Sequence, residues 1–359
     1  MEPALVVIGP QAAGSHHQPG HPERPERVAA VVAGIDDLHL GDALLWIEPR
    51  LATRAELLRV HTPGHLGHLE RLGARARARA RARDGERAGD EGHRVSLDAD
   101  TYLAGDSYDL ATRAAGAGLQ AIAEAQRRRV PAMVAVRPPG HHATAGQAMG
   151  FCLLNNVAVA AASLVASGQR VAIIDWDVHH GNGTEAIFWD NPDVLYVSTH
   201  QWPCYPGTGQ AGDVGGTGHE AAKGGVVNVP LPPGTTGDLM VRAFAEIVTP
   251  VVDAFSPDWV LVSAGFDAHR ADPLADLALS AGDYGVLATL VAGYAPHPGR
   301  LVVFLEGGYD LSALRMSTAA TLAALVGADL LPVEAPTTGG DGTEVLARVA
   351  MARRRSLGD

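Results

Sequence analysis

Four short apolar runs, each followed by a polar turn that contains glycine, constrain the fold of this chain more than any other feature. The runs are residues 132–136, 171–174, 259–263 and 301–305. Each is shorter than an ordinary helix and rich in Val, Ile, Leu or Ala, which is typical of a buried strand. Helix-like segments separate the runs, so the pattern predicts an α/β fold around a mostly parallel sheet.

Polar residues follow the second run in quick succession. Asp175, Asp177 and His179 are spaced by two, so their side chains point the same way while the backbone stays extended. Carboxylate oxygen and imidazole nitrogen are suitable zinc ligands, and three protein ligands leave one position for water. Taken alone, the stretch also fits a hydrogen-bonded turn without a metal.

The turns after the other runs also supply reactive side chains, which are, in chain order, His141, His142, Asp267 and Tyr309. Because the carboxyl ends of parallel strands meet at one edge of a sheet, we expect these turns to converge. Asp177, His179 and Asp267 would then form a site of two carboxylates and one imidazole for zinc or a similar divalent ion. Convergence of four strand ends favours the metal site over the simple turn.

The same convergence predicts hydrolytic chemistry. His142 would accept the proton of a water beside the ion, with the adjacent His141 tuning the field. Asp175 and Asn182 are available to orient the two rings. A phenol such as Tyr309 would stabilise an oxyanion, an effect of about 3–4 kcal/mol for one donor removed. The residues therefore predict metal-assisted hydrolysis of an amide or ester.

Six longer motifs stand in a fixed order along the chain. They are His21–Arg27, Arg137–Ala143, Gly150–Cys152, Asp175–Thr184, Ser263–Asp267 and Glu306–Tyr309. Together they resemble the histone deacetylase family, and most closely its branch of class II enzymes, bacterial amidohydrolases and acetylpolyamine amidohydrolases. The resemblance spans about residues 15–325. It implies the arginase/deacetylase fold, a single parallel sheet of about eight strands flanked by helices.

The resemblance also implies roles for individual residues. In the reaction these are the zinc ligands Asp177, His179 and Asp267, the general base His142, its electrostatic partner His141 paired with Asp175, and the carbonyl-polarising Tyr309. Around the substrate they are Phe151 and Tyr205 in the walls of a narrow acyl-lysine channel, Gly140 along it, Leu274 near its mouth and Asp100 at its rim. A structural potassium ion is implied near Asp175, held by carbonyls of Asp177, His179 and Thr199 and by the hydroxyl of Ser198.

Three positions distinguish this chain within the resemblance. Asn182 stands where class I enzymes carry Asp and class II enzymes carry Asn. Tyr205 replaces a more usual Phe and adds a hydroxyl to the channel wall. Leu274 is not the acidic residue expected of a polyamine-selective enzyme. The expected substrate is an acetyl-lysine in a peptide or protein, with an acetylated polyamine as the alternative.

Two other functions fit the residues less well. A binuclear manganese ureohydrolase like arginase needs further carboxylates for a second metal, whereas Asn182 and the histidine pair suit one metal and a base. A non-catalytic acyl-lysine-binding protein would keep the pocket. The intact metal ligands, the base and Tyr309 argue against that function.

Composition narrows the class of protein further. Strand-like runs recur to about residue 305 without a linker, so we expect one catalytic domain over 1–359, with 331–359 as a C-terminal extension. A net charge of −12 argues against a nucleic-acid binder. Two cysteines make no disulfide framework, and no signal segment or membrane-length apolar run is present, so we expect a cytoplasmic protein without a membrane partner. A homo-oligomer remains open, since members of the resembled family often form dimers or tetramers.

Two segments carry no clear chemistry. In residues 71–94 Arg alternates with Ala before three glycines, which predicts an inserted mobile loop or an extended, solvated helix, with the preceding helix ending near Leu72. The His-rich loop at 15–27 is more typical of a solvated rim than of a metal site. A helix of small residues is expected at 108–126.

Overall fold

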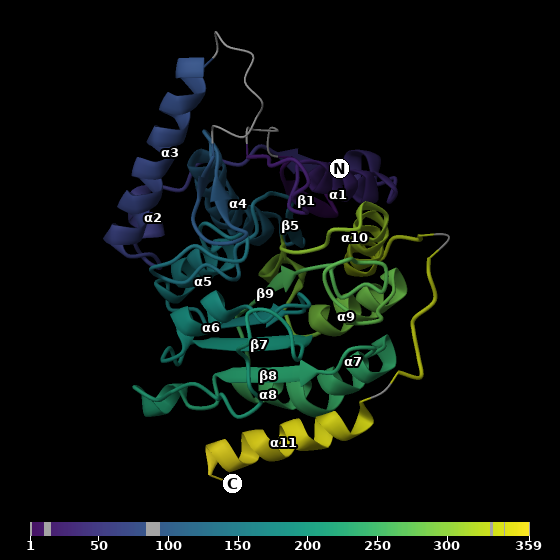
Figure 1. The fold of residues 1–359 in the computed structure, drawn as a ribbon. Helices are drawn as coiled ribbons and strands as arrows, with labels where there is room; N and C mark the ends of the chain where they lie inside the picture. The colour runs from purple at the N-terminus through teal and green to yellow at the C-terminus, as the bar shows by residue number, and fades with distance from the viewer. Residues whose placement is uncertain (1, 11–15, 84–93, 331–332, 341, 359) are drawn as a thin grey trace.

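An eight-stranded sheet forms the centre of the protein (Figure 1). The computed structural model describes residues 2–10, 16–83, 94–330, 333–340 and 342–358. All neighbouring strands of the sheet are parallel, in the order β2-β1-β5-β10-β9-β6-β7-β8. Its strands are β1 (Leu5–Ile8), β2 (Leu44–Ile47), β5 (Ala132–Val134), β6 (Val171–Asp175), β7 (Val194–Gln201), β8 (Val226–Leu231), β9 (Trp259–Ala264) and β10 (Leu301–Leu305). A separate antiparallel hairpin joins β3 (Val95–Ser96) to β4 (Tyr102–Leu103).

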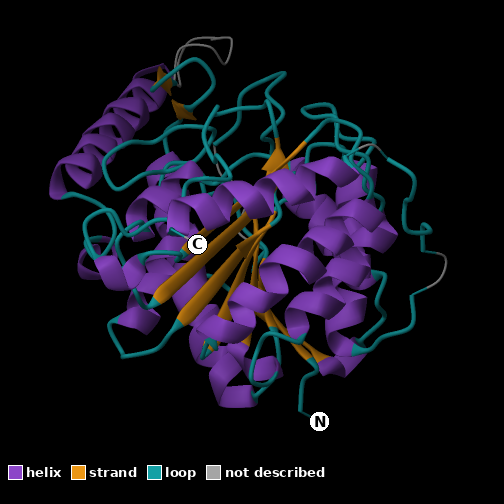
Figure 2. Ribbon diagram, turned by 90° about the horizontal axis from the view of Figure 1, so that it is seen from below, coloured by secondary structure: helices purple, strands orange, loops and turns teal. Residues whose placement is uncertain are grey.

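Helices cover both faces of this sheet, and Figure 2 shows the strands lying between the two helical layers. The helices are α1 (Glu26–Asp36), α2 (Arg54–Leu57), α3 (Pro63–Arg83), α4 (Ser107–Arg128), α5 (Asn156–Val165), α6 (Asn182–Phe188), α7 (Gly237–Ala243), α8 (Thr249–Phe255), α9 (Ala281–Ala292), α10 (Leu311–Val326) and α11 (Thr343–Leu357). Shorter helical segments are Gly41–Ala43, Glu220–Ala222, Phe244–Val248 and Pro298–Arg300. None of the helices in the described part of the chain combines the length and apolar character needed to cross a membrane.

The sheet separates two hydrophobic cores, and β1 contributes to both. Leu5 and Val7 pack with α1, α9 and α10 on one face, while Val6 and Ile8 pack with α4 and α5 on the other. All four side chains are fully buried. A strand buried on both faces is apolar throughout, which is why continuous runs and not alternating patterns marked the strands in the sequence. The four predicted runs correspond to β5, β6, β9 and β10.

The two outermost strands of the sheet were not predicted from the sequence. β2 is apolar, but it is only four residues long and every residue in it is only partly buried. β8 contains Asn228 and Pro230, and proline is tolerated there because an edge strand leaves one side of its backbone without a strand partner. Arg353 of α11 covers part of that edge and donates hydrogen bonds to the carbonyls of Val226 and Gly224. The C-terminal helix therefore protects an edge that would otherwise invite pairing with another chain.

Residues 71–83 are helical, which confirms the helix and not the loop for this part of the segment, and the prediction that the preceding helix ends near Leu72 is wrong. Ala and Arg both have high helix propensity, so the helix continues although alternation by two gives it no apolar stripe. Arg77 donates to the Asp109 carboxylate at 3.1 Å, which ties α3 to α4. Residues 84–93 of the predicted insert lie outside the described part of the chain.

Candidate metal centre and active site

Three side chains from two strand ends converge at the carboxyl edge of the sheet. Asp177 and His179 follow β6, and Asp267 follows the neighbouring β9. One ligand atom from each lies within 4.8 Å of the others. His179 Nδ1 is 3.2 Å from an oxygen of Asp177 and 3.3 Å from an oxygen of Asp267. Both carboxylates are fully buried, so this is an enclosed cluster and not a solvated acidic surface.

Several features of this cluster fit a divalent cation. Asp267 Oδ2 is buried and accepts no hydrogen bond from the described residues. Backbone N–H groups of Gly307 and Val178 donate to Asp177 and Asp267 at 2.8 and 2.9 Å, fixing the direction of both carboxylates. A Cβ atom added at Gly307 would collide with both carboxylates. Two oxygens and one nitrogen, held in place and partly unsatisfied, make a suitable zinc ligand set with room for a further ligand.

The two carboxylates also favour the protonated form of the His179 ring. Burial lowers the pKa of His179, but the Asp177 and Asp267 carboxylates outweigh burial and raise the pKa well above its ordinary value. A cation bound between these groups would displace that proton, because a metal ligand must offer a free nitrogen lone pair. Metal binding to this site should therefore release a proton.

The adjacent histidines after β5 have different partners. His141 Nδ1 lies 3.1 Å from Asp175, while His142 Nδ1 lies 2.8 Å from the side-chain oxygen of Asn182. Burial lowers the pKa of His141, but Asp177 and Asp175 together raise it to about 10. Burial and the charge of His141 hold the pKa of His142 well below its ordinary value. The pair therefore combines a cationic imidazole with a neutral one.

The bond to Asn182 also fixes the tautomer of His142. An amide oxygen only accepts hydrogen bonds, so the proton of the neutral ring sits on Nδ1 and donates to Asn182. The lone pair is then on Nε2. His142 lines the same cavity as His179 and Tyr309. The ring is thus set up to accept a proton from a group inside that cavity.

Tyr309 reaches the cavity from the turn after β10. Its backbone N–H donates to Asp272 at 2.6 Å, and the guanidinium carbon of Arg27 lies 4.8 Å from its ring centroid. Arg27 also donates to the Gly308 carbonyl at 2.7 Å. Burial raises the pKa of the Tyr309 hydroxyl well above its ordinary value, against the opposing charge of Arg27. The phenol therefore stays protonated and is able to donate a hydrogen bond.

A narrow cavity of about 200 Å³ is lined by His141, His142, His179 and Tyr309. Phe151, Tyr205, Leu274 and Asp100 all line it. Gly140 is not among the lining residues; its N–H donates to Glu306 at 2.6 Å, and a Cβ there would collide with the backbone of Asn156. The cavity accommodates a slender chain that ends beside His179 of the candidate metal triad.

A family model described as "Histone deacetylase domain" matches residues 21–325. The chain belongs to the histone deacetylase family. It is 38% identical to "Histone deacetylase 14, chloroplastic" of Arabidopsis thaliana, covering 92% of this chain and 79% of that protein. It is 37% identical to a "Probable deacetylase" of Archaeoglobus fulgidus, covering 89% and 86%. The crystal structure of the HDA15 HD domain matches with a TM-score of 0.82 at 34% identity, over 99% of this chain and 97% of that one.

Family membership confirms three predictions made from the sequence. The resemblance was correct, the fold is the arginase/deacetylase fold, and the protein is a hydrolytic deacetylase. The clustered triad confirms that this deacetylase has a candidate metal site.

Two carboxylates of this deacetylase escaped the sequence analysis. Glu306 is fully buried and accepts the N–H groups of Gly140 and His141 at 2.6 and 3.1 Å, and burial raises its pKa to about 7. Asp272 accepts from the N–H groups of Tyr309 and Leu274. Glu306 thus holds the histidine turn, and Asp272 links the Tyr309 turn to the channel mouth. Glu306 is the first residue of the motif Glu306–Tyr309, but its position in the sequence does not indicate which N–H groups it binds.

The His-rich N-terminal loop of the deacetylase is not a solvated rim, and that prediction is wrong for two of its histidines. His16 and His21 are buried. Glu23 explains the burial of His16. Its carboxylate accepts a hydrogen bond from Arg137 Nε at 2.7 Å. The same carboxylate lies 3.3 Å from His16 Nε2 and 3.4 Å from a guanidinium nitrogen of Arg27. The loop is drawn into the protein by this charge network, whose Arg27 also supports the Tyr309 turn.

The residues expected around a potassium ion lie on neighbouring strands. Asp175 at the end of β6 pairs in register with Ser198 of β7. The hydroxyl of Ser198 is 2.9 Å from His200 Nδ1, and Thr199 Oγ1 has no hydrogen-bond partner among the described residues.

Proposed function

We propose that this protein hydrolyses the amide bond of Nε-acetyl-lysine in peptides or proteins, with a zinc ion held by Asp177, His179 and Asp267. One observation carries the proposal. A neutral histidine, a protonated phenol and His179 of the partly unsatisfied ligand triad line a single narrow cavity. This combination supplies the ligand set, the proton acceptor and the oxyanion donor that hydrolysis of an unactivated amide needs.

Each residue then has a defined part in the reaction. When bound, the zinc ion polarises the substrate carbonyl and lowers the pKa of a water. His142 Nε2 accepts a proton from that water as its oxygen forms a bond to the carbonyl carbon. The Tyr309 hydroxyl donates a hydrogen bond to the carbonyl oxygen, and the His141 cation stabilises the negative charge. As the C–N bond breaks, His142 returns its proton to the lysine nitrogen, leaving acetate and a free amine.

The walls of the cavity select the shape of the substrate. Phe151 and Tyr205 both line it, and the Tyr205 ring meets the His142 ring edge-on, with centroids 5.1 Å apart. An unbranched alkyl chain between these aromatic side chains would bring its amide to His142 and Tyr309. Asp100 at the mouth offers a carboxylate to an N–H group of the substrate main chain. The same proposal includes a structural potassium ion beside Asp175 and Ser198, which pair in register on β6 and β7.

The direct test is a deacylation panel on zinc-loaded protein with acetyl-lysine peptides, acetylputrescine and acetylspermidine, with product release followed by mass spectrometry. The proposal predicts turnover of the peptides, abolished in His142→Ala and retained in His68→Ala, which removes an exposed histidine of α3. Tight peptide binding without hydrolysis would instead indicate a non-catalytic binding protein. Faster turnover of the polyamines would reassign the substrate.

A further inference from the structure

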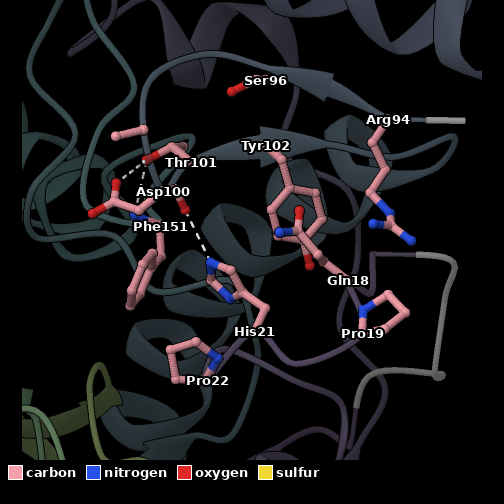
Figure 3. A pocket seen from close by; sticks show the side chains of 11 residues that line it. Gln18, Pro19, His21, Pro22, Arg94, Ser96, Asp100, Thr101, Tyr102 and Phe151 are labelled. Carbon is pink, nitrogen blue, oxygen red and sulfur yellow. Dashed lines mark hydrogen bonds between the residues drawn. The ribbon is translucent and has the colours of Figure 1, made fainter. Parts of the chain in front are cut away.

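A second and larger cavity, of about 600 Å³, adjoins the catalytic channel (Figure 3). Asp100 and Phe151 line both cavities, so they form a shared wall. The remaining lining comes from the N-terminal loop and the β3–β4 hairpin, namely Gln18, Pro19, His21, Pro22, Arg94, Ser96, Ala99, Thr101 and Tyr102. Its volume lies in the range of about 300–1,000 Å³ typical of ligand sites. None of the reaction steps above uses this cavity.

Hydrogen bonds hold the wall between the two cavities in place. Asp98 Oδ1 accepts the N–H groups of Asp100 and Thr101 at 3.0 and 2.6 Å, which closes the turn. Thr101 Oγ1 accepts the Phe151 N–H at 3.1 Å. His21 Nδ1 accepts the Glu23 N–H, so its Nε2–H donates to the Asp100 carbonyl at 3.0 Å. The shared wall is therefore a fixed part of the site.

The cavity has opposite charges at its two ends. Figure 3 shows Asp100 beside Phe151 at one end and Arg94 near Tyr102 and Gln18 at the other. Arg94 is partly buried and is the last residue of the Arg-rich insert 71–94. A ligand that leaves the catalytic channel thus passes a carboxylate first and meets a guanidinium farther along.

A peptide substrate matches this order of charges. When an acetyl-lysine side chain fills the channel, its main chain must lie at the mouth beside Asp100. The residues next to that lysine are then the part of the peptide able to enter the second cavity. There Arg94 would meet a carboxylate, for which a planar guanidinium with paired donors is well suited. An acetylated polyamine has no carboxylate and would bring ammonium groups toward Arg94.

We propose that this second cavity binds residues flanking the acetyl-lysine, and that Arg94 selects an acidic side chain among them. The inference rests on the proposed function and narrows its substrate to acidic peptide segments. The whole chain carries a net charge of −12 and repels acidic peptides at long range. A preference for an acidic flank must therefore arise from a local cation, and among the described residues that line this cavity Arg94 is the one lysine or arginine.

The test compares acetyl-lysine peptides that are identical except for Glu, Gln or Lys at the flanking positions. For each, kcat/KM is measured on the zinc-loaded enzyme, and binding is measured separately by fluorescence anisotropy. We expect the Glu peptide to exceed the Lys peptide by about tenfold, the size of one charge-assisted hydrogen bond. Arg94→Glu should invert this ratio and Arg94→Lys should keep part of it. Arg79→Glu, the same charge change at an exposed site on α3, should leave the ratio unchanged.

The two measurements separate this inference from the proposed function. Equal kcat/KM for the three peptides, or the same ratio in Arg94→Glu and Arg79→Glu, would overturn the inference while leaving deacetylation intact. Charge-dependent binding that Arg94→Glu inverts, without turnover of any peptide, would support the cavity and refute the proposed function. Absence of both turnover and charge-dependent binding, or better turnover of acetylspermidine than of the Glu peptide, would overturn the acidic-peptide preference.

Discussion

Two adjacent imidazoles take on different charges because one faces a carboxylate and the other an amide. Asp175 lies beside His141 and favours its cation, whereas Asn182 lies beside His142 and only accepts a proton already present. A carboxylate beside one ring and an amide beside the other thus separate the proposed electrostatic partner, His141, from the proposed base, His142. The family resemblance implied the pairing of His141 with Asp175. The residues alone left open which ring Asp175 and Asn182 would orient, since both lie 34 or more residues from the histidines.

Replacing Asn182 by Asp should move the acid limb of the kcat/KM profile to higher pH. A carboxylate stabilises the protonated ring and so raises the pKa of His142, and the base must be neutral to act. The limb should shift by about 1–2 pH units, since a neighbouring opposite charge commonly moves a pKa by this amount. Asn191→Asp, the same change beyond the end of α6, serves as the control. An unmoved acid limb in Asn182→Asp would remove His142 as the base.

Removing the Tyr309 hydroxyl should slow turnover without loss of metal. Tyr309→Phe deletes one oxyanion donor, and such deletions reduce kcat by about 10²–10³-fold. Initial rates and zinc content are measured together. Tyr108→Phe is the matched control. It removes a hydroxyl that donates to Glu70 at 3.0 Å, and Tyr108 does not line the channel. Near-normal kcat in Tyr309→Phe would show that the phenol has no part in the reaction.

Among the helices and strands, the fully buried strands were the ones that could be predicted from the sequence. β5, β6, β9 and β10 are apolar except for Asp175 and Ser263 near the ends of β6 and β9, because both faces of these strands are covered, and the sequence predicted each of them. β2 and β8 lie at the edges and were not predicted from the sequence. β2 is a partly exposed apolar run of only four residues, and β8 is interrupted by Asn228 and Pro230. The length of α3 was missed because alternating Ala and Arg lacks a helical apolar period.

The N-terminal loop was missed for another reason, which is that its partners are far away in sequence. Glu23 and Arg137 are 114 residues apart, so only the fold shows that this pair is buried. Burial alone raises the pKa of Glu23, but the hydrogen bond from His16 and the charge of Arg137 hold it below its ordinary value. The network anchors α1 and, through Arg27, the Tyr309 turn.

Glu23→Gln should therefore destabilise the fold, by about 3–5 kcal/mol, the usual cost of removing one partner of a buried ion pair. Because the folded pKa of Glu23 is depressed, its stabilisation is present above the unfolded carboxyl pKa of about 4.3 and is lost as pH falls below it. Urea unfolding at neutral and acidic pH checks both statements. The control is Glu26→Gln, an exposed carboxylate at the start of α1. Equal stability of the two variants at neutral pH would contradict this assignment.

At the scale of the whole molecule, the parallel sheet is what makes the site. Its carboxyl edge collects the turns after β5, β6, β9 and β10, and these turns supply the histidine pair, the metal triad and Tyr309. That convergence was predictable, because it follows from strand direction. The supporting carboxylates Glu306 and Asp272 and the cavity beside Arg94 were not, because they depend on how the turns and loops pack.

Metal content of the zinc-loaded and desalted protein tests the central claim most directly. The account predicts about one zinc ion per chain in the wild type and almost none in Asp267→Ala, with an unchanged circular dichroism spectrum. Asp253→Ala, which removes an exposed carboxylate of α8, should hold zinc as the wild type does. Full zinc content in Asp267→Ala, or two tightly bound metal ions in the wild type, would contradict it.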